Sequence, residues 1–255
     1  MNAFSNNLAA GIQPELSEKF CQIHNERMVK VLGRDTCRSC AQELLQKSEA
    51  EHAQELLAST RKKRVNAAMI PARHASCGFK NYAASTQAQQ YAVAQCKKFS
   101  GDFVKGQAGN MIMTGRTGTG KTHLACAMIR NILHLGGFAR YITSEDMANS
   151  IANAWTRQDC SEASEIYRFT EYDLLIVDEY GLHDQHENRL KLVHKVLYSR
   201  YDAKKPTIVI SNFTTDELRK NLGDRLWSRF QHDGLTVVEC NWLDARMGDG
   251  CERSA

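Results

Sequence analysis

The chain has 255 residues, of which 42% are hydrophobic and 24% are charged, so it is long enough for one sizeable core and a small appendage. No run of about 18 or more uncharged apolar residues occurs, and residues 1–20 lack the basic start and apolar core of a signal peptide, which argues against a membrane-spanning or exported class. We expect a cytoplasmic protein without a membrane partner. Its net charge of +4 permits nucleic-acid binding without requiring it.

Four possible metal ligands stand in two close pairs near the N-terminus. Two residues separate Cys21 from His24, and two separate Cys37 from Cys40. This spacing is compatible with a tetrahedral Zn²⁺ site, although three free thiols and a surface histidine are the alternative. We expect a structural zinc site, because a metal would let this weakly apolar segment fold. The other cysteines lack such partners, and we interpret them as ordinary thiols: Cys77, Cys96, Cys126, Cys160, Cys240 and Cys251.

Residues 41–69 are rich in Ala, Leu, Glu, Gln and Lys and contain neither Gly nor Pro, which favours one long helix. Paired leucines at 44–45 and 56–57 form a thin apolar stripe, which indicates a connector or a partner-binding helix. The basic run at 61–64 is typical of a solvated helix face, and contact with a DNA backbone or an acidic protein surface is the alternative.

The chain divides into three parts by its pattern. We expect an N-terminal module over residues 1–45, a helical linker over 46–73 and a larger domain over 74–255. In the last part, short apolar runs alternate with helical patterns, which is typical of an α/β fold with a buried parallel sheet between helices. The expected strands are 110–115, 139–143, 172–179, 206–212 and 235–241.

The stretch GRTGTGKTHLACAM follows the first of these strands and satisfies the pattern G-x-x-x-x-G-K-[ST] at Gly115, Gly120, Lys121 and Thr122. Its glycines let backbone N–H groups point at phosphate oxygens, the lysine adds a positive charge, and the threonine hydroxyl binds Mg²⁺. The nucleotide contacts we expect are Gly115, Arg116, Thr117, Gly118, Thr119, Gly120, Lys121, Thr122 and His123.

Residues 144–169 are expected to insert helical structure that carries Trp155, Arg157, Tyr167 and Arg168. Core packing is the usual reason for an aromatic side chain in a helix. Aromatic rings with neighbouring arginines would also suit stacking and phosphate contacts with single-stranded DNA.

Asp178 and Glu179 emerge from the apolar strand LLIV. Beside a phosphate loop, Asp178 would hold the Mg²⁺ shell, and Glu179 would orient or deprotonate the attacking water. The second acid favours hydrolysis over transfer of phosphate to a metabolite.

Asn212 ends the next strand, where it could cap a helix or sense the γ-phosphate; its position beside the other two strand ends favours the second role. Arg225 and Arg229 lie four residues apart, on one face of an expected helix. They are either solvated surface arginines or an arginine finger that reaches the nucleotide site of an adjacent copy.

GRTGTGKT, LLIVDE, ISN and GDRLWSRF, in this order, resemble the AAA+ ATPases. From about residue 74 to residue 243, two thirds of the chain, the sequence is similar to the DnaC-type replicative helicase loaders of bacteria and phages. SCGFKNYAA, YDLLIVDEYGL and the closing segment, which runs from LGDRLWSRF to VVECNW, contribute to this similarity. The closing segment also resembles the DnaA initiators. The resemblance implies an α/β AAA+ P-loop core. The few residues after the last strand predict that it has no full lid domain.

The resemblance also implies a loader that binds ATP and single-stranded DNA and associates with a hexameric DnaB-type helicase through its N-terminal region. ATP hydrolysis would be weak and would depend on assembly or DNA, because copies would share the ATP site. By motif matching, the implied roles are phosphate and Mg²⁺ binding for Lys121 and Thr122, metal and water for Asp178 and Glu179, the sensor position for Asn212, and the finger for Arg229, with Arg225 as second choice.

Other functions share these motifs. The transposition helper ATPases of insertion sequences have the same core but serve a transposase, and a DnaA-like initiator is a further alternative. A zinc-containing adaptor, in which ATP acts as a binding switch without turnover, belongs to a different class. The zinc module could contact either the helicase or nucleic acid.

Overall fold

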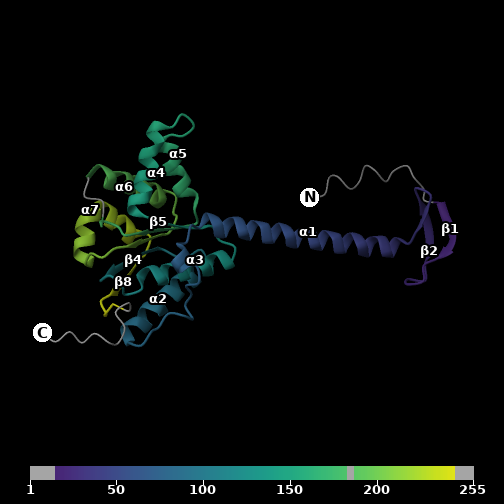
Figure 1. The fold of residues 1–255 in the computed structure, drawn as a ribbon, viewed down its shortest axis with the longest axis horizontal. Helices are drawn as coiled ribbons and strands as arrows, with labels where there is room; N and C mark the ends of the chain where they lie inside the picture. The colour runs from purple at the N-terminus through teal and green to yellow at the C-terminus, as the bar shows by residue number, and fades with distance from the viewer. Residues whose placement is uncertain (1–14, 183–186, 245–255) are drawn as a thin grey trace. The chain divides into compact units, whose positions relative to one another are not determined.

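A computed structural model describes residues 15–182 and 187–244. The chain, drawn in Figure 1, divides into two compact units, and the boundary along the sequence falls between Thr60 and Arg61. Among the described residues, no helix is long and apolar enough to cross a membrane. Cys251, which we interpreted as an ordinary thiol, lies outside the described residues.

The N-terminal unit begins with three short antiparallel strands in the order β1-β2-β3: Glu15–Phe20, Arg27–Val31 and Arg34–Thr36. Leu32 and Gly33 join β2 to β3 with φ angles of 51° and 78°, the backbone of a tight hairpin turn. Ser17 is the buried residue of β1, and Val29 is that of β2. The sequence did not predict these strands, because they bury too little apolar surface to show an alternating pattern.

Helix α1 spans Arg38–Ala67, which confirms the expected long helix with slightly earlier bounds. All of its residues are described, and none of them is buried. Leu44, Leu45, Leu56 and Leu57 are all more than half exposed. A helix with no buried face is what we expect of a connector or a surface for a partner.

The end of α1 belongs to the second unit, where it contacts the end of α3. The Arg64 guanidinium donates to the carbonyl of Gly136, and Arg61 lies 3.2 Å from the Nδ1 atom of His134. Two of the four basic residues at 61–64 therefore make contacts within the second unit.

The second unit contains a five-stranded parallel sheet in the order β5-β6-β7-β4-β8. The strands are β4 Asn110–Gly115, β5 Ala139–Thr143, β6 Leu174–Asp178, β7 Thr207–Ile210 and β8 Leu235–Cys240. The helices are η1 Ala72–His74, α2 Gln87–Val104, α3 Lys121–His134, α4 Ser144–Asn153, η2 Ala154–Thr156, α5 Glu162–Glu171, α6 Glu187–Asp202 and α7 Thr215–His232. The α/β fold and its strands are confirmed.

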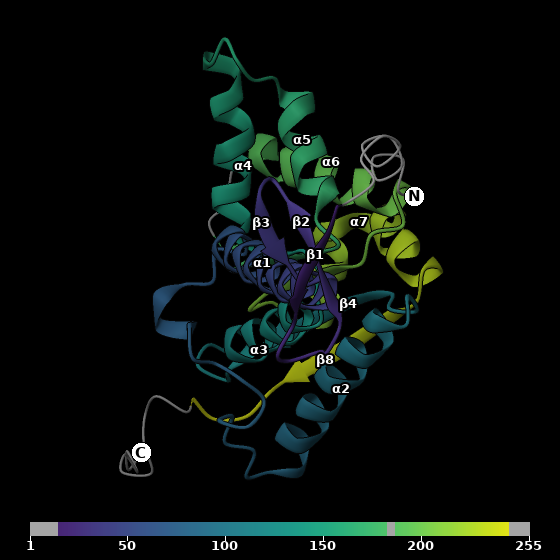
Figure 2. The same ribbon diagram turned by 90° about the vertical axis from the view of Figure 1, so that its right-hand side faces the viewer.

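Helices cover both faces of this sheet. Met111 and Met113 of β4 pack with α2 and α3 on one face, while Ile112 packs with the core of α4 to α7 on the other. Figures 1 and 2 show the two helical layers on opposite sides of the strands. Because all five strands are parallel, their carboxyl ends meet along one edge, where ligands bind in such sheets.

Two features of the helices bear on function. Helix α7 is interrupted at Gly223, whose φ of 77° and ψ of 152° are not helical, so residues 224–232 form a separate segment that carries both candidate arginines. In the expected helical insertion, Trp155 and Tyr167 are 63% and 64% exposed. Core packing therefore does not account for either aromatic ring.

Candidate nucleotide site and metal cluster

The phosphate loop runs from the end of β4 to the start of α3. Gly115 and Gly120 have φ angles of 125° and 85°, which side chains with a Cβ atom rarely allow. A Cβ atom at Gly115 would lie 2.2 Å from the carbonyl oxygen of Cys240, and one at Gly120 would lie 2.6 Å from the ring of Tyr82. Both conformation and space require glycine at these positions.

Lys121 is buried and folds back over this loop. Its Nζ atom donates to the carbonyls of Gly115 and Arg116, at 2.6 and 2.7 Å, and to Oδ1 of Asn212 at 3.0 Å. The last contact joins the phosphate loop to the end of β7. These three acceptor oxygens are neutral, and an ammonium group forms stronger hydrogen bonds with charged phosphate oxygens.

Asp178 and Thr122, the two expected Mg²⁺ ligands, are in direct contact. Oδ2 of Asp178 accepts from Oγ1 of Thr122 at 2.7 Å and from the Tyr141 hydroxyl at 2.9 Å, and Oδ1 accepts from the N–H of Glu179 at 2.7 Å. The carboxylate of Asp178 and the hydroxyl of Thr122 are oxygen ligands of the kind that Mg²⁺ prefers, so the two residues fit the ion. Burial, followed by the charge of Asp178, raises the pKa of Tyr141 far above its usual value, so its hydroxyl stays a donor.

A cavity of about 270 Å³ lies over these groups. Its lining is His74, Thr117, Gly118, Thr119, Gly120, Lys121, Thr122, His123, Asp178, Glu179, Ser211 and Asn212. Gly115 and Arg116 line an adjoining cavity of about 390 Å³, which shares Asn212. The structure thus brings the expected loop, acid pair and asparagine to one place.

Two residues that the sequence did not single out support the loop from outside, and a third lines the cavity. The Tyr82 hydroxyl and Nε1 of Trp242 both donate to the Thr119 carbonyl, each at 2.9 Å. The chain segments before β4 and after β8 therefore meet at the phosphate loop. His74 contributes differently, because it lines the cavity from η1.

The two candidate finger arginines lie on the second segment of α7, and neither is among the residues that line the described cavity of the same chain. Arg225 is exposed. Arg229 lies 3.7 Å from Asp202 and stacks on the rings of Tyr198 and Tyr201, with its guanidinium carbon 4.8 and 4.9 Å from the ring centres. Arg229 is therefore held against α6 in a single chain.

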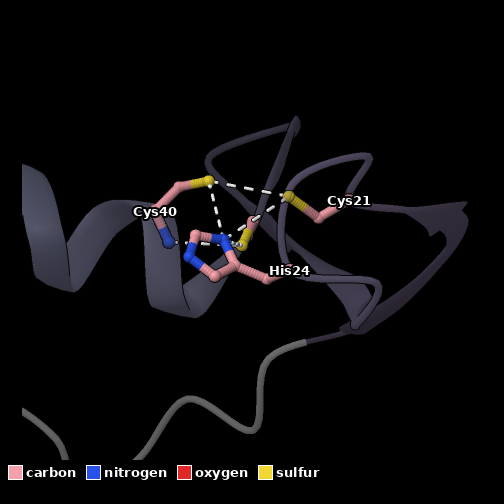
Figure 3. A group of neighbouring side chains, drawn as sticks. Cys21, His24 and Cys40 are labelled. Carbon is pink, nitrogen blue, oxygen red and sulfur yellow. Dashed lines mark hydrogen bonds between the residues drawn. The ribbon is translucent and has the colours of Figure 1, made fainter.

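Cys21, His24, Cys37 and Cys40 form a cluster in the N-terminal unit, and their ligand atoms all lie within 4.8 Å of one another. Figure 3 shows Cys21, His24 and Cys40 turned toward one another. Nδ1 of His24 lies 3.3 Å from the sulfur of Cys40 and 3.5 Å from that of Cys37, and the sulfurs of Cys21 and Cys40 are 3.6 Å apart. Tetrahedral zinc places such donors roughly 3.5 to 3.8 Å apart, so the cluster is compatible with zinc.

Two glutamates fix the cluster from outside. Glu43 lies 2.9 Å from Nε2 of His24, which leaves Nδ1 to face the sulfurs. Glu26 accepts from the N–H and the hydroxyl of Ser39 at 2.8 and 3.0 Å, and from the Cys37 thiol at 2.9 Å. Carboxylates that orient a histidine ligand are common around protein metal sites.

The thiols of the cluster differ in acidity. Hydrogen bonds from the backbone and the ring of His24 lower the pKa of Cys21 to about 6. Burial and the Glu26 carboxylate raise the pKa of Cys37 to about 12. Three clustered thiols do not all ionise without a cation among them, and a divalent metal would supply that charge.

The family model described as "IstB-like ATP binding protein" matches residues 24–239. The chain is 27% identical over 169 residues to the replicative helicase loader DnaC of Escherichia coli K12, covering 66% of this chain and 69% of that protein. It is 23% identical over 222 residues to the DnaC of Buchnera aphidicola subsp. Baizongia pistaciae, covering 87% of each chain.

Solved structures share the fold. A crystal structure of the DnaC helicase loader aligns with 67% of this chain and 100% of its own, with a TM-score of 0.60 at 18% identity. The replication initiator DnaA bound to AMPPCP and single-stranded DNA aligns with 69% of this chain and 52% of its own, with a TM-score of 0.57 at 20% identity.

Proposed function

Because the chain belongs to the IstB-like ATP-binding family of AAA+ proteins, we propose that it is an ATP-dependent loader that places a DnaB-type replicative helicase on DNA. The observation that carries ATP hydrolysis is the contact of Thr122 with Asp178 beside Glu179, which joins a phosphate loop to an acid pair. The names of the DnaC relatives support replication as the process and a helicase as the partner.

In this proposal the loop from Gly115 to His123 binds the ATP phosphates with its backbone N–H groups. Lys121 exchanges its carbonyl partners for phosphate oxygens, and Asn212 contacts the γ-phosphate. Thr122 and Asp178 hold Mg²⁺, which neutralises charge on the phosphates when bound. Glu179 orients or deprotonates the attacking water.

The arginine that completes this site is proposed to come from an adjacent copy of the chain. Arg229 is the first choice and Arg225 the second. In one chain Arg229 lies against Tyr198, Tyr201 and Asp202, so assembly would have to draw it from those contacts. Hydrolysis would then be weak in the free protein and stronger in assemblies.

The N-terminal unit is proposed to bind zinc and the helicase. Cys21, His24, Cys37 and Cys40 would hold the ion, which would supply the stability that the three small strands lack. Phe20, at the end of β1, and Leu32, between β2 and β3, are 60% and 100% exposed, so they offer apolar contacts to a protein partner. We assign this surface to the helicase rather than to nucleic acid.

Single-stranded DNA is proposed to bind the insertion formed by α4, η2 and α5. Trp155 and Tyr167 are exposed there and could stack on bases. Arg157 and Arg168 pair with Asp159 and Glu165, at 2.8 and 2.5 Å, so phosphate contacts would compete with these ion pairs.

The identity of the partner decides between this function and the transposition helper. The experiment is capture of a purified DnaB-type helicase and, separately, of an insertion-sequence transposase on the immobilised full chain. Retention of the helicase supports the loader. Retention of the transposase alone would overturn it. A Leu32→Asp variant is expected to weaken helicase capture. The matched control is Leu135→Asp, which changes an exposed leucine of the second unit.

Turnover decides between a loader and a passive adaptor. ATP hydrolysis is measured with and without single-stranded DNA for the wild type, Glu179→Gln and Arg229→Ala. Loss of turnover in both variants, with ATP still bound, excludes a switch without hydrolysis. Equal and negligible rates in all three proteins would favour the adaptor.

A further inference from the structure

Glu179 has a backbone conformation that requires support from its surroundings. Its φ angle is 55°, in the left-handed region, where a residue with a Cβ atom is strained. Gly181 also has a positive φ, of 81°, so the chain turns sharply after β6. Such a conformation persists only where neighbouring contacts fix the backbone on both sides.

The end of β7 supplies these contacts. The N–H of Tyr180 donates to the Ile210 carbonyl at 2.9 Å, and the Ser211 hydroxyl donates to the Tyr180 carbonyl at 2.7 Å. The same hydroxyl accepts from the N–H of Phe213 at 3.1 Å, which fixes its direction. Tyr180 and Ser211 are both 1% exposed, so water does not replace either hydrogen bond.

Two side chains close around the same turn. The ring of Phe213 lies against Gly181, with its Cε2 atom 2.3 Å from where a Cβ atom would stand. The Tyr180 hydroxyl lies 2.7 Å from Nε2 of His194 on α6. The turn after the acid pair is thus held by residues 210–213 and by α6.

We propose that Ser211 is the positioning residue for Glu179, and that it couples the acid to the nucleotide sensor. Asn212, the next residue, accepts from the Lys121 ammonium at 3.0 Å. Asn212, which contacts the phosphate loop, is therefore the direct neighbour in the chain of Ser211, which fixes the turn that carries Glu179. A shift of Asn212 on nucleotide binding moves the Ser211 hydroxyl and, through the Tyr180 carbonyl, the backbone of Glu179. This inference rests on the proposed hydrolysis of ATP.

The test is Ser211→Ala in the full chain. Because the hydroxyl contacts the turn and not the loop, kcat for ATP is expected to fall roughly ten- to a hundredfold while the Kd for ATP stays within about twofold. Ser211→Thr keeps the hydroxyl and is expected to restore most of the rate. The matched control is Ser100→Ala, which removes a buried hydroxyl bonded to a backbone carbonyl, that of Cys96 at 3.0 Å, on α2.

Amide hydrogen exchange of residues 174–182 gives a second readout, which needs no turnover. Ser211→Ala is expected to speed exchange at the Tyr180 amide, and Ser100→Ala is not. Unchanged exchange overturns the inference, as does an unchanged kcat in a protein that hydrolyses ATP. If the wild type does not hydrolyse ATP at all, the proposed hydrolysis fails, and the exchange result alone decides whether Ser211 holds the turn.

Discussion

Tyr141 contacts Asp178 of the acid pair from β5, a strand for which the sequence predicted no catalytic residue. Its hydroxyl donates to the same oxygen of Asp178 that accepts from Thr122, so it fixes the carboxylate that we propose as a Mg²⁺ ligand. Tyr141→Phe removes one hydrogen bond to a charged group. We expect the Mg²⁺ concentration for half-maximal hydrolysis to rise roughly tenfold.

The measurement is ATP turnover over a Mg²⁺ titration at saturating nucleotide. The control is Tyr172→Phe, which removes the hydroxyl of another buried tyrosine and should leave the titration unchanged. A Tyr141→Phe curve that overlays the wild type would mean that Thr122 and the Glu179 amide suffice to orient Asp178.

At the residue scale, the sequence predicted what is contiguous in the chain. The phosphate loop and the acid pair are local motifs, so their chemistry can be recognised before the fold is known. Tyr141 and Trp242 reach the site through tertiary contacts, and no short pattern marks either one. Arg200 is a further example: it is fully buried among backbone carbonyls, where burial lowers its pKa to about 9, although an arginine in a helix usually lies at the surface.

The break in α7 at Gly223 belongs to the scale of the element. A Cβ atom there would meet nothing within 4 Å, so only the backbone conformation requires glycine. We expect Gly223→Ala to cost roughly 1 to 3 kcal/mol, and to lower the Tm by roughly 2 to 8 °C, because an L side chain is strained at this φ and ψ.

Gly101→Ala in α2 is the matched control, because a Cβ atom there also meets open space but φ is not in the positive range. We expect it to raise the Tm slightly, since alanine favours a helix over glycine. Thermal unfolding of the two variants side by side checks the pair; equal shifts would contradict the conformational explanation.

The cysteine cluster also acts at the scale of the element. If zinc binds, its removal by a chelator is expected to unfold residues 15–37 while leaving the parallel sheet intact, because the three strands bury little else. Elemental analysis should find about one zinc ion per chain, and hydrogen exchange should locate the loss.

A Cys37→Ser and Cys40→Ser double variant should contain no zinc and show the same loss without a chelator. Cys160→Ser, which changes a half-buried thiol outside the cluster, should keep its zinc. Near-zero zinc in the wild type, prepared with zinc present, would contradict the metal assignment.

The strands were easiest to predict where both of their faces are buried. β4, β6 and β7 are buried along their whole length, so they read as continuous apolar runs. β1 and β2 are mostly exposed, and neither periodicity nor composition marks them. Where a cysteine and histidine cluster stands in place of a hydrophobic core, the pattern from which strands are predicted is missing.

The proposed shared site would be a property of an assembly of several copies, and it is best tested by mixing variants. If Arg229 acts on a neighbouring copy, an equal mixture of Glu179→Gln and Arg229→Ala chains contains sites with an intact acid and an intact finger. Random mixing makes about a quarter of the sites complete, so turnover should recover to about a quarter of the wild-type rate.

Mixing either variant with the Glu179→Gln and Arg229→Ala double variant is the control and should restore nothing. A mixture no more active than its two components would place the arginine in the same chain as its acid. Repeating the mixture with Arg225→Ala distinguishes the two candidate fingers.

The hydrogen bond from Trp242 to the Thr119 carbonyl places a fluorescent side chain in contact with the phosphate loop. Indole emission depends on the polarity around the ring and on the partner of its N–H group, and this indole is bonded to the loop that we propose binds ATP. Trp155 is largely exposed, and Trp227 is buried on the other face of the sheet. The surroundings of both therefore differ from those of Trp242. If ATP binds this loop as proposed, the fluorescence of Trp242 would report nucleotide occupancy, and binding could be followed in unlabelled protein during assembly with a partner.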